Sequence, residues 1–377
     1  MTELMQRILP TVQKPARYTG GEWGEIKKDL KDVRVRVAFC FPDTYEIGMS
    51  NLGMRILYGV MNGMDGVWCE RVFAPWGDME QAMRDNSLPL WALESQTPVR
   101  EFDMIAFTIG YEMAYSNILN MLNLAGVPLR SKDRQGLKNI VFAGGVCAFN
   151  PEPLADFIDF FSLGEGEDIT VEILQLYDRA KAEGWSKDAF LHEAAKIPGV
   201  YVPSFYRHEY NADGTLAAIV PLEGVPQTVT KRIIEDLDNA YFPTKMIVPS
   251  TEIVHDRANL EVFRGCIRGC RFCQAGYVYR PVRNRSRELC ARYGVESCND
   301  SGYQEVPLSS LSTSDYPPLT ELCDQLEPFC QQRHVNLSLP SLRADNFSMS
   351  LMERLAKGGC AMIIVGDVPV GKSKFEK

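Results

Sequence analysis

Apolar residues follow two alternating patterns between Val33 and Gly184. Runs rich in β-branched and aromatic residues, such as VRVRVAFCF (33–41) and FDMIAFTIG (102–110), have the composition of buried strands. Each run is followed by apolar residues at helical spacing, as in SNLGMRILYGVMNG (50–63). The same strand and helix patterns recur at 67–75, 77–86, 115–126, 138–151, 157–167 and 168–184.

Strands that alternate with helices at this spacing predict βαβ units and a parallel sheet. We therefore expect an α/β fold whose first domain is a doubly wound, flavodoxin-like sheet over residues 33–184. Ligands of such sheets bind at the carboxyl ends of the strands. The loops expected there are rich in Gly, Pro, Asp and Glu, and they are either plain turns or ligand contacts: PDTYEIG (42–48), TIGYE (108–112), AGGVCAFNPEP (143–153) and LGEGE (163–167).

The rest of the chain divides into three parts by its composition. Residues 1–32 are polar and rich in turn formers, which predicts an N-terminal arm. Residues 185–248 alternate turns with short strand-like runs and predict a linker. A second domain is expected over residues 249–377.

Composition places few limits on function. The chain is 45% hydrophobic and 24% charged, with a formal net charge of −9, so no overall field favours nucleic acid or an anionic membrane. No apolar run is long enough to span a bilayer, and residues 1–18 lack the pattern of a signal peptide. These features predict a cytoplasmic protein without membrane contact.

Three of the eleven cysteines stand out by their spacing: Cys266, Cys270 and Cys273, in the run RGCIRGCRFC. Thiolates hold the iron of a [4Fe–4S] cluster, and three ligands leave one iron open to an amino and carboxylate group. The preceding run LEVF places this loop at a strand end, which in a barrel is the active face. The alternatives are reduced cysteines or a zinc site, which needs a fourth ligand such as His255.

These residues resemble the radical S-adenosylmethionine superfamily, and in particular its B12-binding-type branch. The resemblance rests on VHDRANLEVFRGCIRGCRFCQAGYVYRPVRNRS, on the upstream runs KPARYTGGEW, FPDTYEIGMSNLG, FAGGVCAFNPEP and LGEGE, and on LSSLSTSDYPPL downstream. It implies a cobalamin-binding-like domain followed by a radical (β/α) barrel. It also implies that Cys266, Cys270 and Cys273 are cluster ligands and that reductive cleavage of S-adenosylmethionine yields a 5′-deoxyadenosyl radical.

The resemblance assigns further positions to cofactors. Phe272 would border the adenine of S-adenosylmethionine. Many relatives receive its amino group on a Gly-Gly-Glu segment, where this chain has hydroxyls such as that of Ser310. By its own chemistry, Arg343 either binds the carboxylate with two hydrogen bonds or forms a surface salt bridge. Asp43, Gly48, Thr108, Gly144, Gly145 and Gly164 would line a cobalamin site. Relatives that ligate cobalt carry Asp-x-His-x-x-Gly, whereas this chain has Tyr45 at the histidine position, so cobalamin would bind without a histidine or not at all.

The end of the chain departs from the family pattern. A full (β/α)8 barrel needs ~250 residues, but only residues 274–377 follow Cys273. We therefore expect an incomplete barrel from a truncated or frameshifted reading frame. The tail also matches a phosphate-binding loop from Gly366 to Ser373, which we interpret as accidental because no helix can follow it.

The sequence thus predicts a radical S-adenosylmethionine enzyme, or a fragment of one, with an external electron donor such as flavodoxin or ferredoxin. A basic run, Arg280, Arg283, Arg285 and Arg287, is either a solvated face or an entrance for an anionic or RNA substrate. The alternatives are a non-catalytic iron–sulfur protein for electron transfer and an inactive fragment that serves as an interaction module.

Overall fold

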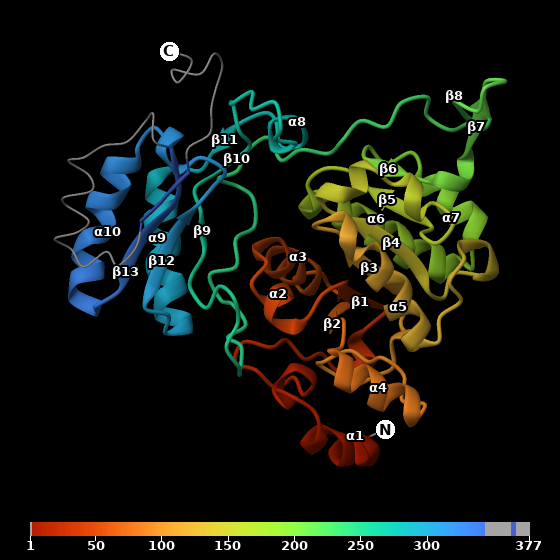
Figure 1. Ribbon diagram of the computed structural model, residues 1–377, viewed down its shortest axis with the longest axis horizontal. Helices are drawn as coiled ribbons and strands as arrows, with labels where there is room; N and C mark the ends of the chain where they lie inside the picture. Colours follow the sequence, from red (N-terminus) through yellow and green to blue (C-terminus); the bar gives the residue numbers. More distant parts are fainter. Residues whose placement is uncertain (1, 344–362, 367–377) are drawn as a thin grey trace. The chain divides into compact units, whose positions relative to one another are not determined.

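The computed structural model describes residues 2–343 and 363–366, and it divides into two compact units (Figure 1). Unit 1 comprises residues 1–233 and 249–254, and unit 2 comprises residues 234–248 and 255–377. Each unit is described separately below.

Unit 1 is built on one six-stranded sheet with the order β2-β1-β3-β4-β5-β6. Its strands are parallel except β6, which pairs antiparallel with β5. The order of the first five strands is that of a flavodoxin-like sheet, so the predicted fold is confirmed. The strands are β1 (Val35–Phe41), β2 (Val67–Phe73), β3 (Met104–Thr108), β4 (Ile140–Gly144), β5 (Phe160–Ser162) and β6 (Val200–Tyr201).

Helices connect these strands, and short-range signals define their ends. The Asn51 side chain accepts a hydrogen bond from the Met54 N–H at the start of α3, and Gly184 ends α6 in the left-handed conformation. Helices α3 and α6 pack against each other, while Arg84 of α4 donates hydrogen bonds to Asn120 and Asn123 of α5. The helices are α1 (Thr2–Ile8), α2 (Tyr45–Met49), α3 (Leu52–Asn62), α4 (Gly77–Asp85), α5 (Tyr115–Ala125), α6 (Gly166–Glu183) and α7 (Lys187–Ala194).

The N-terminal arm is tied to the sheet by a buried ionic cluster. Arg71 of β2 is 1% exposed and donates to both carboxylate oxygens of Glu22, at 3.0 and 2.9 Å. It also donates to Glu94 at 2.6 Å, and it lies 3.4 Å from Glu25. Because each buried charge has a partner, the cluster holds the arm in one place on unit 1.

The segment predicted as a linker, 185–248, is divided between the two units. Helix α7 and strand β6 lie within it and extend unit 1. The strands β7 (Tyr206–Tyr210) and β8 (Leu216–Pro221) then form an antiparallel hairpin. Residues 234–248 belong to unit 2, where Leu237 and Phe242 are buried.

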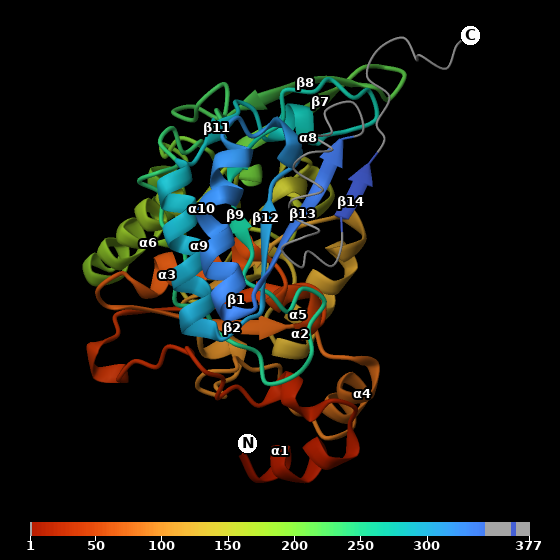
Figure 2. The same cartoon turned by 90° about the vertical axis from the view of Figure 1, so that its left-hand side faces the viewer.

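Unit 2 contains the beginning of a (β/α) barrel, as the sequence predicts. Four parallel strands have the order β14-β13-β12-β9, so neighbours in the sheet follow one another along the chain apart from a small hairpin (Figure 2). Helices α9 and α10 pack against each other and against these strands. The elements are β9 (Leu260–Glu261), β10 (Phe263–Arg264), α8 (Ala275–Val278), β11 (Arg283–Asn284), α9 (Arg287–Ser301), β12 (Glu305–Ser309), α10 (Leu319–Arg333), β13 (Asn336–Arg343) and β14 (Ile363–Gly366).

Candidate functional site

The three spaced cysteines lie on one loop of unit 2. The loop begins at Gly265, directly after β9 and β10, and ends at α8. Cys266, Cys270 and Cys273 are partly exposed, whereas the other cysteines in the described part of the chain are buried. A cluster-binding loop is expected at the carboxyl end of the first barrel strand, and this loop lies there with three accessible thiols.

The cysteine loop has backbone constraints of its own. Gly265 has φ +91°, and a Cβ there would lie 2.6 Å from the carbonyl oxygens of Tyr279 and Pro281. The Cys273 N–H donates to the Cys270 carbonyl at 3.0 Å, which closes a turn between the last two cysteines. Arg280 donates to the carbonyls of Cys266 and Ile267, at 3.4 and 3.3 Å.

The thiols do not form a finished metal site. Over residues 2–343 and 363–366, no three His, Cys, Asp or Glu side chains are arranged so that they could hold a metal ion. The number, chemistry and accessibility of the thiols nevertheless fit three corners of a [4Fe–4S] cube. His255, the alternative fourth ligand for zinc, instead lies 3.1 Å from the Arg257 guanidinium.

A second loop of unit 2 follows β12 at the same end of the parallel sheet. Ser310 and Thr313 share a hydrogen bond of 3.0 Å between their hydroxyls. Thr313 is fully buried, and its hydroxyl also lies within hydrogen-bonding distance of the carbonyls of Leu308 and Pro340. These bonds fix the Ser310 loop against β13, next to the cysteine loop.

The other two residues predicted to contact S-adenosylmethionine have different environments. Arg343 ends β13, is 7% exposed, and donates its backbone N–H to Ser314 at 3.2 Å. Phe272 is 76% exposed on the cysteine loop. Ser310, Arg343 and Phe272 therefore lie on loops or strand ends at one edge of unit 2, and their roles remain predictions. Lys372 and Ser373 of the phosphate-loop match lie outside the described residues.

Two arginines of the basic run after the cysteines are buried, whereas Arg280 is exposed and Arg287 is partly exposed. Arg283 and Arg285 are buried, and they donate to the carbonyls of Ile234 and Leu237, at 2.8 and 2.7 Å. The Arg285 guanidinium also lies 5.4 Å from the ring centroids of Phe242 and Tyr293. The spacing of apolar residues could not predict that these two arginines are buried, because they bind backbone carbonyls that lie far away along the sequence.

An interaction missed by the sequence analysis joins the two loops of unit 2. The Arg268 guanidinium forms two hydrogen bonds with the Asp315 carboxylate, and its Nε lies 2.9 Å from Oδ2. Arg268 stands between the first two cysteines, and Asp315 lies in the short turn after Ser310 and Ser312. No short motif relates these positions, although each is part of a run that resembles the family.

In unit 1, the predicted cobalamin positions follow the carboxyl ends of β1, β3, β4 and β5. Asp43 follows β1, and its carboxylate accepts a hydrogen bond from the Tyr111 hydroxyl in the loop after β3. This hydrogen bond to the carboxylate is the main cause that raises the pKa of Tyr111 to about 12. Thr108 and Gly144 pair in register at the ends of β3 and β4. Tyr111 was not selected from the sequence.

Packing within the chain accounts for three of the selected glycines. A Cβ at Gly48 would lie 2.2 Å from the Phe73 ring, and one at Gly145 would lie 2.7 Å from the Ile109 carbonyl oxygen. Gly164 has φ +106°, and its Cβ would lie 2.0 Å from the Arg232 carbonyl oxygen. These glycines are therefore needed for close approach of the chain to itself, and they are not by themselves evidence of a ligand.

Tyr45, which stands at the histidine position of the cobalt-binding motif, is turned into the protein. It is 1% exposed, donates to Glu22 at 2.8 Å, and packs edge-on against Phe73. Its hydroxyl is thus part of the arm cluster and does not fit the role of an axial cobalt ligand.

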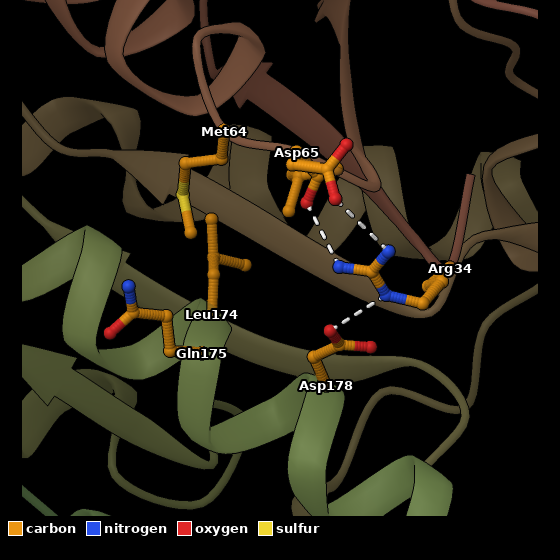
Figure 3. Close-up of a pocket in the computed structure, with 7 residues that line it drawn as sticks. Arg34, Met64, Asp65, Leu174, Gln175 and Asp178 are labelled. Atoms are coloured by element: carbon orange, nitrogen blue, oxygen red, sulfur yellow. Dashed lines mark hydrogen bonds and ion pairs between the residues drawn. The ribbon is translucent and has the colours of Figure 1, made fainter. Parts of the chain in front are cut away.

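Unit 1 also has a cleft of about 270 Å³ away from the predicted positions (Figure 3). It lies beside the amino ends of β1 and β2, near Leu174 of α6. Arg34 lines it and forms ion pairs with Asp65 and Asp178, at 3.3 and 2.9 Å. Since its arginine already has acidic partners, this cleft is a poor candidate for an anionic ligand. In the part of the chain that the structure describes, no helix is long and apolar enough to cross a membrane.

The sequence of this chain is similar to one family model and to a protein from an archaeon. Residues 53–203 match the family model described as the N-terminal region of radical SAM proteins. An uncharacterized protein from Methanocaldococcus jannaschii is 26% identical over 325 residues, which are 85% of this chain and 58% of that protein.

The fold is similar to that of the radical S-adenosylmethionine methyltransferase TsrM from Kitasatospora setae. Two TsrM structures match with TM-scores of 0.54 and 0.55, at 14% identity, over 88% and 89% of this chain. One contains tryptophan substrate and a S-adenosylmethionine analogue, and the other contains cobalamin and a [4Fe–4S] cluster. This chain spans 58–59% of the length of these relatives. The family model thus agrees with the resemblance to radical S-adenosylmethionine proteins that the motifs indicate, and the two TsrM structures share the fold of this chain.

Proposed function

We propose that this chain carries the cluster-binding part of a radical S-adenosylmethionine enzyme, with Cys266, Cys270 and Cys273 as the three protein ligands of a [4Fe–4S] cluster. The observation that carries the proposal is the placement of three accessible thiols on one loop after the first strand of a parallel barrel sheet. Three ligands leave the fourth iron for the amino and carboxylate groups of S-adenosylmethionine.

In this proposal, one electron from an external donor such as flavodoxin or ferredoxin cleaves bound S-adenosylmethionine to methionine and a 5′-deoxyadenosyl radical. Phe272 would border the adenine, while Ser310 and Arg343 would receive the amino and carboxylate groups. Arginine suits a planar carboxylate because its guanidinium donates two parallel hydrogen bonds. Methyl transfer, methylthiolation and ring-forming oxidation are the reaction outcomes that this chemistry would allow.

Unit 1 would serve as a cobalamin-binding-like domain. A cobalamin at the carboxyl ends of β1 and β3 would meet the Asp43–Tyr111 pair and would receive no axial ligand from Tyr45, which is buried on Glu22. Exposed Ile47 and Met113 lie beside this pair in sequence and would offer apolar contacts to a large ring.

The test of catalysis is anaerobic incubation of the reconstituted chain with dithionite and S-adenosylmethionine, followed by measurement of 5′-deoxyadenosine. We expect product from the parent chain and none from Cys270→Ala. A matched control is Cys298→Ala, which removes a buried thiol of α9 and should leave the yield unchanged. A cluster that forms without any cleavage would favour a non-catalytic iron–sulfur protein instead.

A further inference from the structure

A side chain of the cysteine loop pairs with a residue of the neighbouring loop of unit 2. Arg268, between Cys266 and Cys270, pairs with Asp315 in the turn that follows β12. Both side chains are largely covered, with 25% and 11% of their surface exposed. An ion pair with two hydrogen bonds and limited solvent contact fixes geometry better than an exposed pair does.

Both ends of this pair are held by further contacts. The Ser312 hydroxyl donates to Asp315 Oδ2 at 2.7 Å, which orients the carboxylate toward Arg268. On the other side, a Cβ at Gly276 would lie 2.8 Å from the Arg268 carbonyl oxygen, so α8 approaches the loop backbone closely. The pair thus connects two segments that are each fixed locally.

We propose that Arg268 and Asp315 are positioning residues that set the cysteine loop against the Ser310 loop and balance the charge beside the cluster. The proposal rests on the proposed function, because it concerns the cluster that the cysteines would hold. It extends that function by naming residues that touch neither iron nor S-adenosylmethionine.

The charges of Arg268 and Asp315 predict the direction in which each substitution shifts the midpoint potential of the cluster. Reduction adds an electron to the cluster, so a nearby positive charge favours the reduced form and a negative charge disfavours it. Asp315→Asn leaves the Arg268 charge without Asp315 and should raise the midpoint potential. Arg268→Gln leaves the Asp315 charge without Arg268 and should lower it. The double variant Arg268→Gln/Asp315→Asn should return close to the parent value.

Arg271 provides the matched control, since it lies on the same loop and is exposed. Arg271→Gln changes the charge by the same amount, so it also lowers the potential, but less because solvent screens an exposed group. Its effect should add to that of Asp315→Asn without coupling. Potentials would be measured by redox titration of the reconstituted full chain, with the reduced-cluster resonance as the signal.

Opposite shifts in the two single variants, cancelled in the double variant, support the proposal. It is overturned if both single variants shift the potential in the same direction or not at all, or if Arg271→Gln lowers the potential as much as Arg268→Gln does. A merely structural defect would not give opposite signs.

A parent chain that takes up no iron would refute the proposed function. The positioning role of Arg268 and Asp315 can then still be tested in the chain without iron. In hydrogen–deuterium exchange of the apo chain, the amides of residues 265–274 should exchange several-fold faster in Arg268→Gln and Asp315→Asn than in the parent or Arg271→Gln. Equal exchange in all four chains would overturn the positioning role.

Discussion

Tyr45 donates a hydrogen bond of 2.8 Å to Glu22, so the residue at the histidine position of the cobalt-binding motif is part of the contact between the arm and the sheet. Glu22 in turn receives two hydrogen bonds from Arg71. The position that the resemblance assigns to a cobalt ligand is here part of the hydrophobic and ionic interior.

Replacing Tyr45 by histidine should therefore not create a cobalt ligand. The imidazole of Tyr45→His would face Glu22 inside unit 1. We expect hydroxocobalamin mixed with Tyr45→His to show the same absorption spectrum as with the parent chain. A spectrum of histidine-ligated cobalt in the variant alone would show that position 45 can reach the ligand.

Removing the charge of Arg71 should destabilise unit 1 strongly. Arg71→Met leaves Glu22, Glu25 and Glu94 together without their common cation, which typically costs about 3–5 kcal/mol. The control is Arg84→Met, which breaks an exposed pair with Glu80 and should cost less than about 1 kcal/mol. Urea unfolding monitored by tryptophan fluorescence measures both; equal losses would contradict a structural role for the buried cluster.

The contribution of Glu22 to the free energy of unfolding should depend on pH. Burial acts to raise the pKa of Glu22, but the charge and hydrogen bonds of Arg71 outweigh it and lower the pKa from 4.5 to about 2. A lowered folded pKa gives stability that is present above the unfolded value and is lost as the pH falls toward the folded value.

The free-energy difference between the parent chain and Glu22→Gln should accordingly be constant above about pH 5 and shrink as the pH falls below 4.5. Unfolding curves of both proteins in parallel at several pH values give this difference. A gap that stays constant down to pH 3 would show that Glu22 has an ordinary pKa.

Gly164 should tolerate a side chain less well than Gly184, which also has a positive φ but lies in open space. Gly184→Ala, where nothing lies within 4 Å of the new Cβ, should cost about 1–2 kcal/mol for the left-handed backbone alone. Gly164→Ala adds the approach of Cβ to the Arg232 carbonyl and should cost about 1–3 kcal/mol more. Equal melting temperatures of the two variants would mean that the Arg232 carbonyl moves away from the new Cβ at no cost in free energy.

The sequence predicted most of the fold because strand and helix periodicities are local. Runs such as residues 33–41 and 102–110 form strands β1 and β3, and the cysteine spacing identified the loop after β9. Long-range polar contacts could not be read in the same way. The pairs Arg268–Asp315 and Tyr111–Asp43 join residues 47 and 68 positions apart, and the buried arginines Arg71 and Arg285 look like surface charges in a hydropathy pattern.

The central claim is that the three cysteines hold a cluster with an open iron. Its most direct test is electron paramagnetic resonance of the anaerobically reconstituted and reduced chain, recorded with and without S-adenosylmethionine. We expect a [4Fe–4S]⁺ signal that changes when S-adenosylmethionine is added, disappears in Cys270→Ala and persists in Cys298→Ala. A folded chain that yields no such signal, or a signal that S-adenosylmethionine leaves unchanged, would contradict the account.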